Sequence, residues 1–156
     1  MTVEIELLMK DMEATWDRLT AATLFARDLD AALATLSDTA SVTHLPLMTG
    51  GTGHGGLERF YRDEVFDHVP ADLALRRLSR AVDRFRLADE TMVSFTHDRE
   101  LPWLLPGVQA TDRTVEVLTV TVVAFRKGLI TSQRTLWDHA RLTEQLGVSM
   151  LVAACS

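Results

Sequence analysis

The chain has 156 residues, of which 47% are hydrophobic and 24% are charged. This is the composition of one globular domain, and it excludes the disordered and low-complexity classes. The 16 Lys and Arg residues are outnumbered by 22 Asp and Glu residues, for a formal net charge of -6, and an acidic chain without a basic run predicts no nucleic-acid partner.

The N-terminal part predicts helices and then a strand. Apolar residues recur at helical spacing over residues 5–25, which predicts one long amphipathic helix. Asp28 is placed as the N-cap of a short second helix over residues 29–36. The β-branched run at residues 41–45 predicts a first strand, and a third helix is expected over residues 57–66.

The second half of the chain predicts strands. Four segments suggest them: 73–86, where the alternation is imperfect, 91–97, 115–125 and 129–137. Residues 126–128 predict a hairpin turn, and Asp138 is expected to cap a closing helix that Gly147 ends. The arginines of this half are interpreted as a solvated sheet face: Arg76, Arg77, Arg80, Arg84 and Arg86.

The order of these elements predicts an α+β fold. Helices come first, and the last strands have no helix between them, so they are expected to pair in an antiparallel sheet. Without a linker or an internal repeat, residues 1–156 form a single domain in this interpretation.

A glycine cluster at residues 51–56 matches G-x-G-x-x-G, the pattern of dinucleotide-binding loops. The preceding strand lacks the continuous Val/Ile run of a buried parallel strand, and no second βαβ unit follows. We therefore interpret the cluster as a turn that leads into the third helix, and expect no nucleotide cofactor.

The ends of the chain bear on its location. Glu4 and Glu6 lie where a signal peptide would carry positive charge, and no apolar run approaches the ~20 residues of a membrane-spanning helix. Cys155 is the only cysteine, so no internal disulfide is expected. These features predict a cytoplasmic protein with no membrane partner.

Segments along most of the chain, in their order and spacing, resemble one superfamily: 28–33, 37–42, 55–61, 95–98, 106–107, 115–117, 125–130 and 137–138. It is the nuclear-transport-factor-2-like superfamily, and the resemblance is strongest to its branch of SnoaL-like polyketide cyclases and ketosteroid isomerase. The resemblance implies a SnoaL-like domain in which a cone of helices packs on a curved antiparallel sheet, an alpha-beta barrel. It further implies a deep apolar pocket for a small molecule, and a homodimer. Fold alone does not decide function, because some relatives are not catalysts.

His44 is the first candidate catalytic residue. It shares a strand face with Ala40 and Val42, so its side chain is expected to point toward the core. The position resembles that of the general base of ketosteroid isomerase, and an imidazole could carry a proton near neutral pH. The alternative is a core histidine that bonds a neighbour.

His97 and Gln133 are the other candidate catalytic residues. His97 is placed on the face of Val93 and Phe95 and is similar to a histidine common in SnoaL-like sequences; the alternative is a strand-end residue that bonds a loop. Gln133 shares a face with Trp137 and could orient a carbonyl or a water, or simply satisfy its neighbours.

Five residues are expected to line the substrate pocket: Trp16, Tyr61, Trp103, Thr121 and Trp137. The aromatic residues would wall an apolar ligand, and their alternative is core packing. Thr121 lies where the resemblance places an acidic residue, so the usual cyclase carboxylate is missing. Asp98 and Arg99 have no partner aspartate to complete the Asp-Arg-Asp pattern of limonene epoxide hydrolase. No histidine pair has metal-ligand spacing, so no metal is expected.

We therefore expect a small cofactor-free enzyme that performs a cyclase or isomerase step on a polyketide-like or other apolar carbonyl compound of secondary metabolism. Two alternatives stay open. One is a non-catalytic ligand-binding or dimerisation module, and the other is a hydrolase of epoxides or lactones.

Overall fold

The computed structural model describes residues 2–149, so Cys155 lies outside the described residues. The helices in this part of the chain are α1 (Val3–Ala21), α2 (Leu29–Ala34), α3 (Gly53–Phe60) and α4 (His139–Leu146). Two π-helical turns, η1 (Ala22–Ala26) and η2 (Tyr61–Val65), directly extend α1 and α3. The strands are β1 (Leu36–Leu45), β2 (Thr49–Thr52), β3 (Ala74–Val82), β4 (Arg86–Thr96), β5 (Thr114–Arg126) and β6 (Leu129–Trp137).

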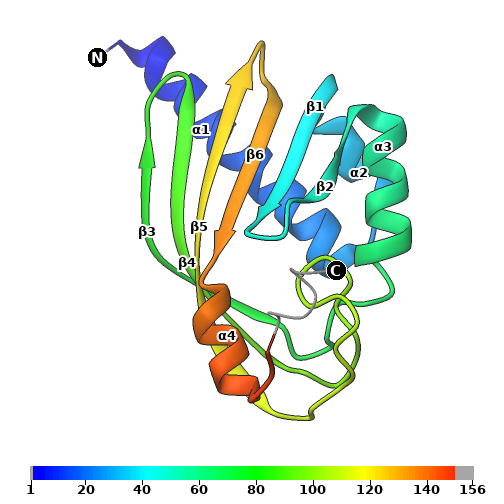
Figure 1. The fold of residues 1–156 in the computed structure, drawn as a ribbon. Coiled ribbons are helices and arrows are strands. Elements are labelled where there is room, and N and C mark those ends of the chain that lie inside the picture. Colours follow the sequence, from blue (N-terminus) through cyan, green and yellow to red (C-terminus); the bar gives the residue numbers. More distant parts are fainter. Residues whose placement is uncertain (1, 150–156) are drawn as a thin grey trace.

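The strands form one curved sheet in the order β2-β1-β6-β5-β4-β3 (Figure 1). The predicted α+β cone of helices on a sheet is confirmed. The sheet is mixed and not wholly antiparallel as predicted, because β1 runs parallel to β6 while the other four pairs of neighbouring strands are antiparallel. It is also open, since β2 and β3 are edges that do not pair with each other, so the strands do not close into the barrel that the resemblance implied.

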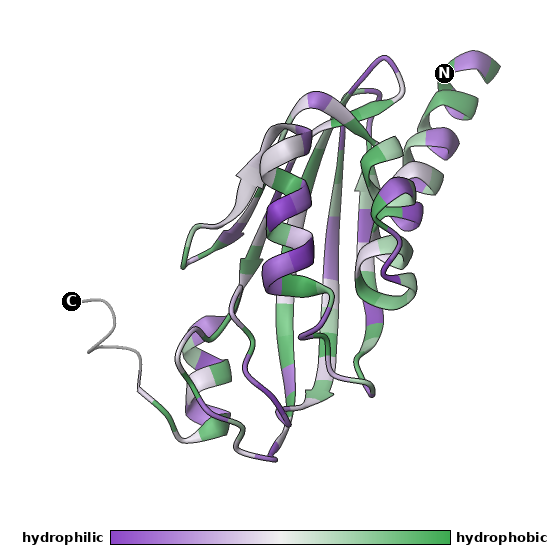
Figure 2. Ribbon diagram, turned by 90° about the vertical axis from the view of Figure 1, so that its right-hand side faces the viewer, coloured by the Kyte–Doolittle hydropathy of each residue, from purple (hydrophilic) through white to green (hydrophobic). Residues whose placement is uncertain are grey.

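Helix α1 runs diagonally across the back of the sheet in Figure 1, and the turned view of Figure 2 shows it alongside the strands. Its Leu19 belongs to the same buried hydrophobic cluster as inward-facing residues of the strands, among them Leu87, Val117 and Val123. Helix α4 packs beside the start of β5, where the Gln145 side chain bonds both the backbone N–H and C=O of Glu116. The core therefore lies between the helices and one face of the sheet.

Several local predictions are confirmed. The Asp28 side chain accepts a hydrogen bond from the Ala31 N–H at the start of α2, and Asp138 does the same for α4. Gly147 ends α4 in the left-handed conformation, and the hairpin turn lies at residues 127–128 between β5 and β6. These features depend on neighbours in the sequence, so they could be predicted locally.

The glycine cluster is more ordered than a turn. Residues 49–52 form β2, and α3 begins at Gly53, four residues before the predicted start of the third helix. Gly50 has φ +142°, and a Cβ there would lie 1.8 Å from the Val42 carbonyl oxygen. A Cβ on Gly51 would lie 2.7 Å from the Gly56 carbonyl oxygen. The glycines allow β2 to pack closely on both β1 and α3.

Two strand boundaries differ from the predictions. The first strand begins at Leu36 instead of residue 41, which shortens the second helix. The segment 73–86 is not one strand: β3 ends at Val82, and Asp83 accepts hydrogen bonds from the Phe85 and Arg86 N–H groups to turn the chain into β4. None of the described helices is both long enough and apolar enough to cross a membrane.

Candidate active site

A cavity of about 250 Å³ lies between the helices and the inner face of the sheet. Seven of the eight predicted site residues line it: Trp16, His44, Tyr61, Trp103, Thr121, Gln133 and Trp137. The exposed side chains of Asp17 on α1 and Arg77 on β3 also border it, which places its opening between these elements. The walls are mainly apolar, as is usual for small-molecule pockets.

His44 lies near the end of β1, on the same strand face as the buried Ala40 and Val42. The Trp137 indole Nε1–H donates a hydrogen bond to His44 Nδ1 over 3.0 Å. The rings of Phe60 and Trp137 flank the imidazole, with centroids 5.8 and 6.2 Å away. Burial lowers the pKa of His44 to about 4, so the ring is neutral at pH 7.

A polar strip crosses β5 and β6 on the cavity wall. Gln133 Nε2 donates to Thr135 Oγ1, and the hydroxyls of Thr121 and Thr135 share a hydrogen bond, each over 3.0 Å. Each hydroxyl has one hydrogen to donate, and only one of the two is used in the bond between them. The hydrogen of the other hydroxyl has no acceptor among the described residues. The strip therefore offers a bound molecule a hydroxyl donor and the Gln133 carbonyl oxygen.

The aromatic wall is continuous around Tyr61. Its ring stacks on Phe66 at 5.9 Å and contacts Phe60 at 5.4 Å. Burial raises the pKa of the Tyr61 hydroxyl, which stays protonated. That hydroxyl has no hydrogen-bond partner among the described residues, so it is a second free donor at the cavity.

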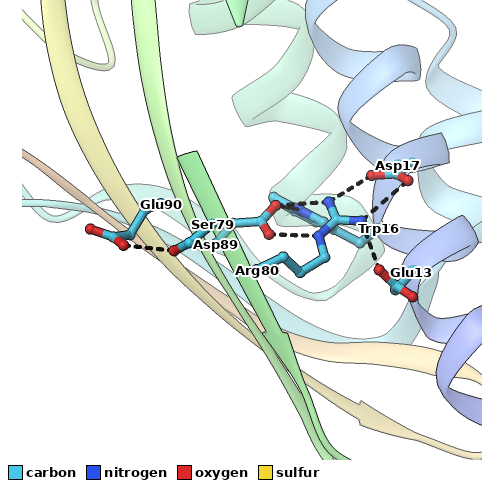
Figure 3. Close-up of polar contacts among 7 residues, drawn as sticks. All are labelled: Glu13, Trp16, Asp17, Ser79, Arg80, Asp89 and Glu90. Atoms are coloured by element: carbon cyan, nitrogen blue, oxygen red, sulfur yellow. Dashed lines mark hydrogen bonds and ion pairs between the residues drawn. The ribbon is translucent and has the colours of Figure 1, made fainter. Parts of the chain in front are cut away.

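A charged cluster that was not predicted borders the cavity (Figure 3). Arg80 donates to both carboxylate oxygens of Asp89, at 2.6 and 2.8 Å, and to Asp17 at 2.8 Å. The Trp16 indole N–H also donates to Asp89, at 2.9 Å, and Glu13 lies 3.4 Å from Arg80. Hydrogen bonding to Asp89, and then to Asp17, raises the pKa of Arg80, so the guanidinium stays charged.

One expectation is corrected by this cluster. Arg80 is not part of a solvated face, because only 9% of its side chain is exposed. The cluster also holds an Asp-Arg-Asp arrangement that was not predicted, in which Asp17, Arg80 and Asp89 come from three different elements. One signal could have found Asp89: the alternation of Thr91, Val93 and Phe95, extended back by one step, places it on the inner face.

His97 does not line the cavity. Strand β4 ends at Thr96, and the His97 ring is buried beneath the following loop, where Nδ1 lies 3.0 Å from the Thr111 hydroxyl. Burial lowers its pKa. His97 is buried, as its alternation with Val93 and Phe95 predicts, but its ring meets the loop and not the cavity. The structure therefore supports the alternative interpretation, a strand-end residue that hydrogen-bonds the following loop.

Within residues 2–149, no three His, Cys, Asp or Glu side chains gather as ligands for a metal ion. The glycine cluster lies outside the cavity, in a separate hollow that Arg59, Asp63 and Glu64 also border.

No family model matches the chain, and no curated protein matches it in sequence. Solved structures do match. A candidate SnoaL-like polyketide cyclase from Jannaschia sp. CCS1 has a TM-score of 0.74 at 14% identity, over 91% of this chain and 95% of that one.

Two further solved structures have a similar fold. An NTF2-like protein of unknown function from Burkholderia pseudomallei has a TM-score of 0.65 at 20% identity, over 87% of this chain and 97% of that one. A protein with a ketosteroid isomerase-like fold from Catenulispora acidiphila has a TM-score of 0.65 at 12% identity, over 86% and 93%. The chain therefore has the nuclear-transport-factor-2-like fold, in the form also seen in SnoaL-like proteins.

Proposed function

We propose that this chain is a small cofactor-independent enzyme that binds an apolar, carbonyl-bearing compound and performs a cyclisation or isomerisation. The observation that carries the proposal is the pairing of an aromatic-walled cavity with a neutral His44 and a polar strip that has free hydrogen-bonding groups. The fold shared with a candidate polyketide cyclase supports it.

In this proposal the apolar walls hold one conformer of the substrate, and the polar groups orient its oxygen. Confinement of a reactive conformer removes part of the entropic barrier to ring closure. Donors aimed at an oxygen that gains negative charge stabilise the transition state in a site that excludes water. His44 is the proposed catalytic group and Gln133 the proposed orienting group, while His97 has no part because it lies outside the cavity.

A hydrolase of epoxides or lactones is the second candidate, and the Asp17–Arg80–Asp89 cluster favours it. Two carboxylates held by one guanidinium beside a cavity could position a water molecule. Arg80 contacts both oxygens of Asp17 as well as both oxygens of Asp89, so exposure decides between the two carboxylates. Asp17, 56% exposed against 7% for Asp89, would have to activate the water.

The test starts from the compound that co-purifies with the protein, extracted and identified by mass spectrometry, and uses a panel of its carbonyl analogues as substrates. A His44→Phe variant should still bind the ligand but lose turnover by about 10²–10³-fold, as expected for removal of one hydrogen-bond donor to a developing oxyanion. His68→Gln, outside the cavity, is the matched control. Oxygen-18 from solvent in the product would identify the hydrolase, and binding without any turnover would identify a carrier.

A further inference from the structure

The hydrogen bond between His44 and Trp137 fixes which imidazole nitrogen carries the proton. An indole N–H is a donor and has no lone pair to offer, so the nitrogen that accepts from it must be unprotonated. That nitrogen is His44 Nδ1, at 3.0 Å from Trp137 Nε1. In a neutral ring the single proton therefore lies on Nε2.

The surroundings of His44 also favour the neutral ring. Its strand neighbours are Thr49 on β2 and Thr135 on β6, and the rings of Phe60 and Trp137 flank it. None of these groups is charged. The charged side chains that border the cavity, Asp17, Arg77, Arg80 and Asp89, belong to α1, β3 and β4 instead. The described residues offer His44 Nε2 no hydrogen-bond partner, which leaves that N–H for a ligand.

We infer that His44 recognises the oxygen acceptor of its ligand as a neutral Nε2–H donor, with Trp137 as the positioning residue that holds this tautomer. The inference rests on the proposed function and deepens it, because it names the atom that meets the carbonyl. It also excludes His44 as the general base. To accept a proton at Nε2, the ring would have to move its own proton to Nδ1, where it would face the indole N–H.

The tautomer can be measured without any ligand. Long-range proton–nitrogen NMR spectra of protein labelled with ¹⁵N-histidine distinguish a protonated ring nitrogen from a bare one, and a His44→Gln spectrum assigns the signals. At pH 7 the unaltered protein should show a bare Nδ1 and a protonated Nε2. A proton on Nδ1, or a doubly protonated ring, overturns the proposal.

The role of Trp137 is tested with two tryptophan variants. Trp137→Phe removes the donor to Nδ1, so His44 should become a mixture of tautomers and its titration midpoint should rise by roughly 0.5–1 pH unit, the equivalent of one hydrogen bond. Trp103→Phe removes an indole from the same cavity, but that indole N–H has no partner among the described residues. This control should leave the His44 spectrum unchanged. Equal effects of the two variants would show that Trp137 acts only through packing.

The hydrogen bond from His44 Nε2 to the ligand is tested with two probes of nearly equal shape, 2-acetylnaphthalene and 2-isopropenylnaphthalene. Only the first has a carbonyl. The ketone should bind roughly 3–10-fold more tightly, and its carbonyl stretch should move to lower frequency when bound. His44→Phe should abolish both effects, and His44→Gln, which keeps an N–H donor, should retain part of them. Equal affinities for the two probes, or binding of neither, contradict the hydrogen bond from His44 to the ligand. Tighter binding of the ketone without turnover of any substrate contradicts only the proposed function.

Discussion

Arg80 on β3 and Asp89 on β4 are directly paired across the β3–β4 hairpin, and their side chains meet through two short hydrogen bonds on the inner face of the sheet. Only 9% and 7% of the two side chains are exposed. The same guanidinium reaches Asp17 and Glu13, so the cluster ties helix α1 to the sheet edge beside the opening of the cavity.

Loss of Arg80 should therefore destabilise the fold. Arg80→Met leaves the Asp89 carboxylate buried with only the Trp16 N–H as a partner, and an uncompensated buried charge typically costs about 3–5 kcal/mol. Urea unfolding at pH 7 measures the free energy of unfolding. The double variant Arg80→Met/Asp89→Leu should recover much of that loss, because a pair of apolar side chains often replaces a buried ion pair at little cost.

An exposed ion pair provides the matched control. Arg62 on η2 and Glu58 on α3 lie 3.5 Å apart, with 61% and 43% of their side chains exposed. Arg62→Met should change the free energy of unfolding by no more than about 0.5 kcal/mol. Similar losses for Arg62→Met and Arg80→Met would contradict the structural importance of the cluster.

The free energy of unfolding should fall as the pH is lowered from 6.5 to 4, and His44 should cause part of that fall. The pKa of His44 is lowered from 6.5 to about 4 by burial, so in this window the unfolded chain binds a proton that the folded chain does not. Stability then rises with pH, by at most roughly 3 kcal/mol across the window.

The measurement is a series of urea unfolding curves at several pH values for the unaltered protein and His44→Gln. The variant should show a flatter dependence, and the remaining slope should include His97, whose pKa is also lowered by burial. Parallel curves for the two proteins would show that His44 titrates normally in the folded state.

The outer face of the sheet should form a homodimer interface. Val120 and Leu136 are paired across β5 and β6, and they are 36% and 53% exposed. Adjacent apolar side chains on an uncovered sheet are often an interaction site.

Leu136→Glu should shift the sedimentation profile to the monomer. Phe85 is 59% exposed but lies at a turn, so Phe85→Glu should leave the profile unchanged. A monomeric unaltered protein at micromolar concentration would exclude the dimer.

Local chemistry explains which parts of the fold could be predicted. The cap of Asp28 and the turn at residues 127–128 depend on residues next to them, and both are present in the structure. The inward direction of the His44 side chain could be predicted because Ala40, Val42 and His44 occupy alternate positions of one strand. The superfamily resemblance supplied what local patterns could not, which is the arrangement of helices around a pocket.

Tertiary irregularities explain the errors. A register shift between Arg77 and Ser79 turns Arg80 inward, and it depends on pairing with β4 and not on the sequence of β3 alone. His97 was placed at the end of its strand, but nothing in its own segment shows that its ring meets Thr111 of the following loop instead of the cavity. The tautomer of His44 depends on Trp137, 93 residues away in the chain, and no sequence pattern joins the two.

Alanine substitutions in the glycine cluster should separate close packing from a ligand-binding loop. Gly50→Ala places a Cβ 1.8 Å from the Val42 carbonyl oxygen at φ +142°, so the β1–β2 pair must separate and the protein should be strongly destabilised or unfold. Gly55 lies inside α3, and a Cβ added there would have only the end of the Arg59 side chain within 4 Å, at 3.9 Å. Because alanine favours a helix more than glycine does, Gly55→Ala should stabilise the protein by about 0.5–1 kcal/mol. Thermal melts measure both variants, and calorimetry with NAD⁺ and FAD should detect no binding to the unaltered protein. Tight nucleotide binding that Gly55→Ala weakens without loss of stability would instead identify these residues as a phosphate-binding loop.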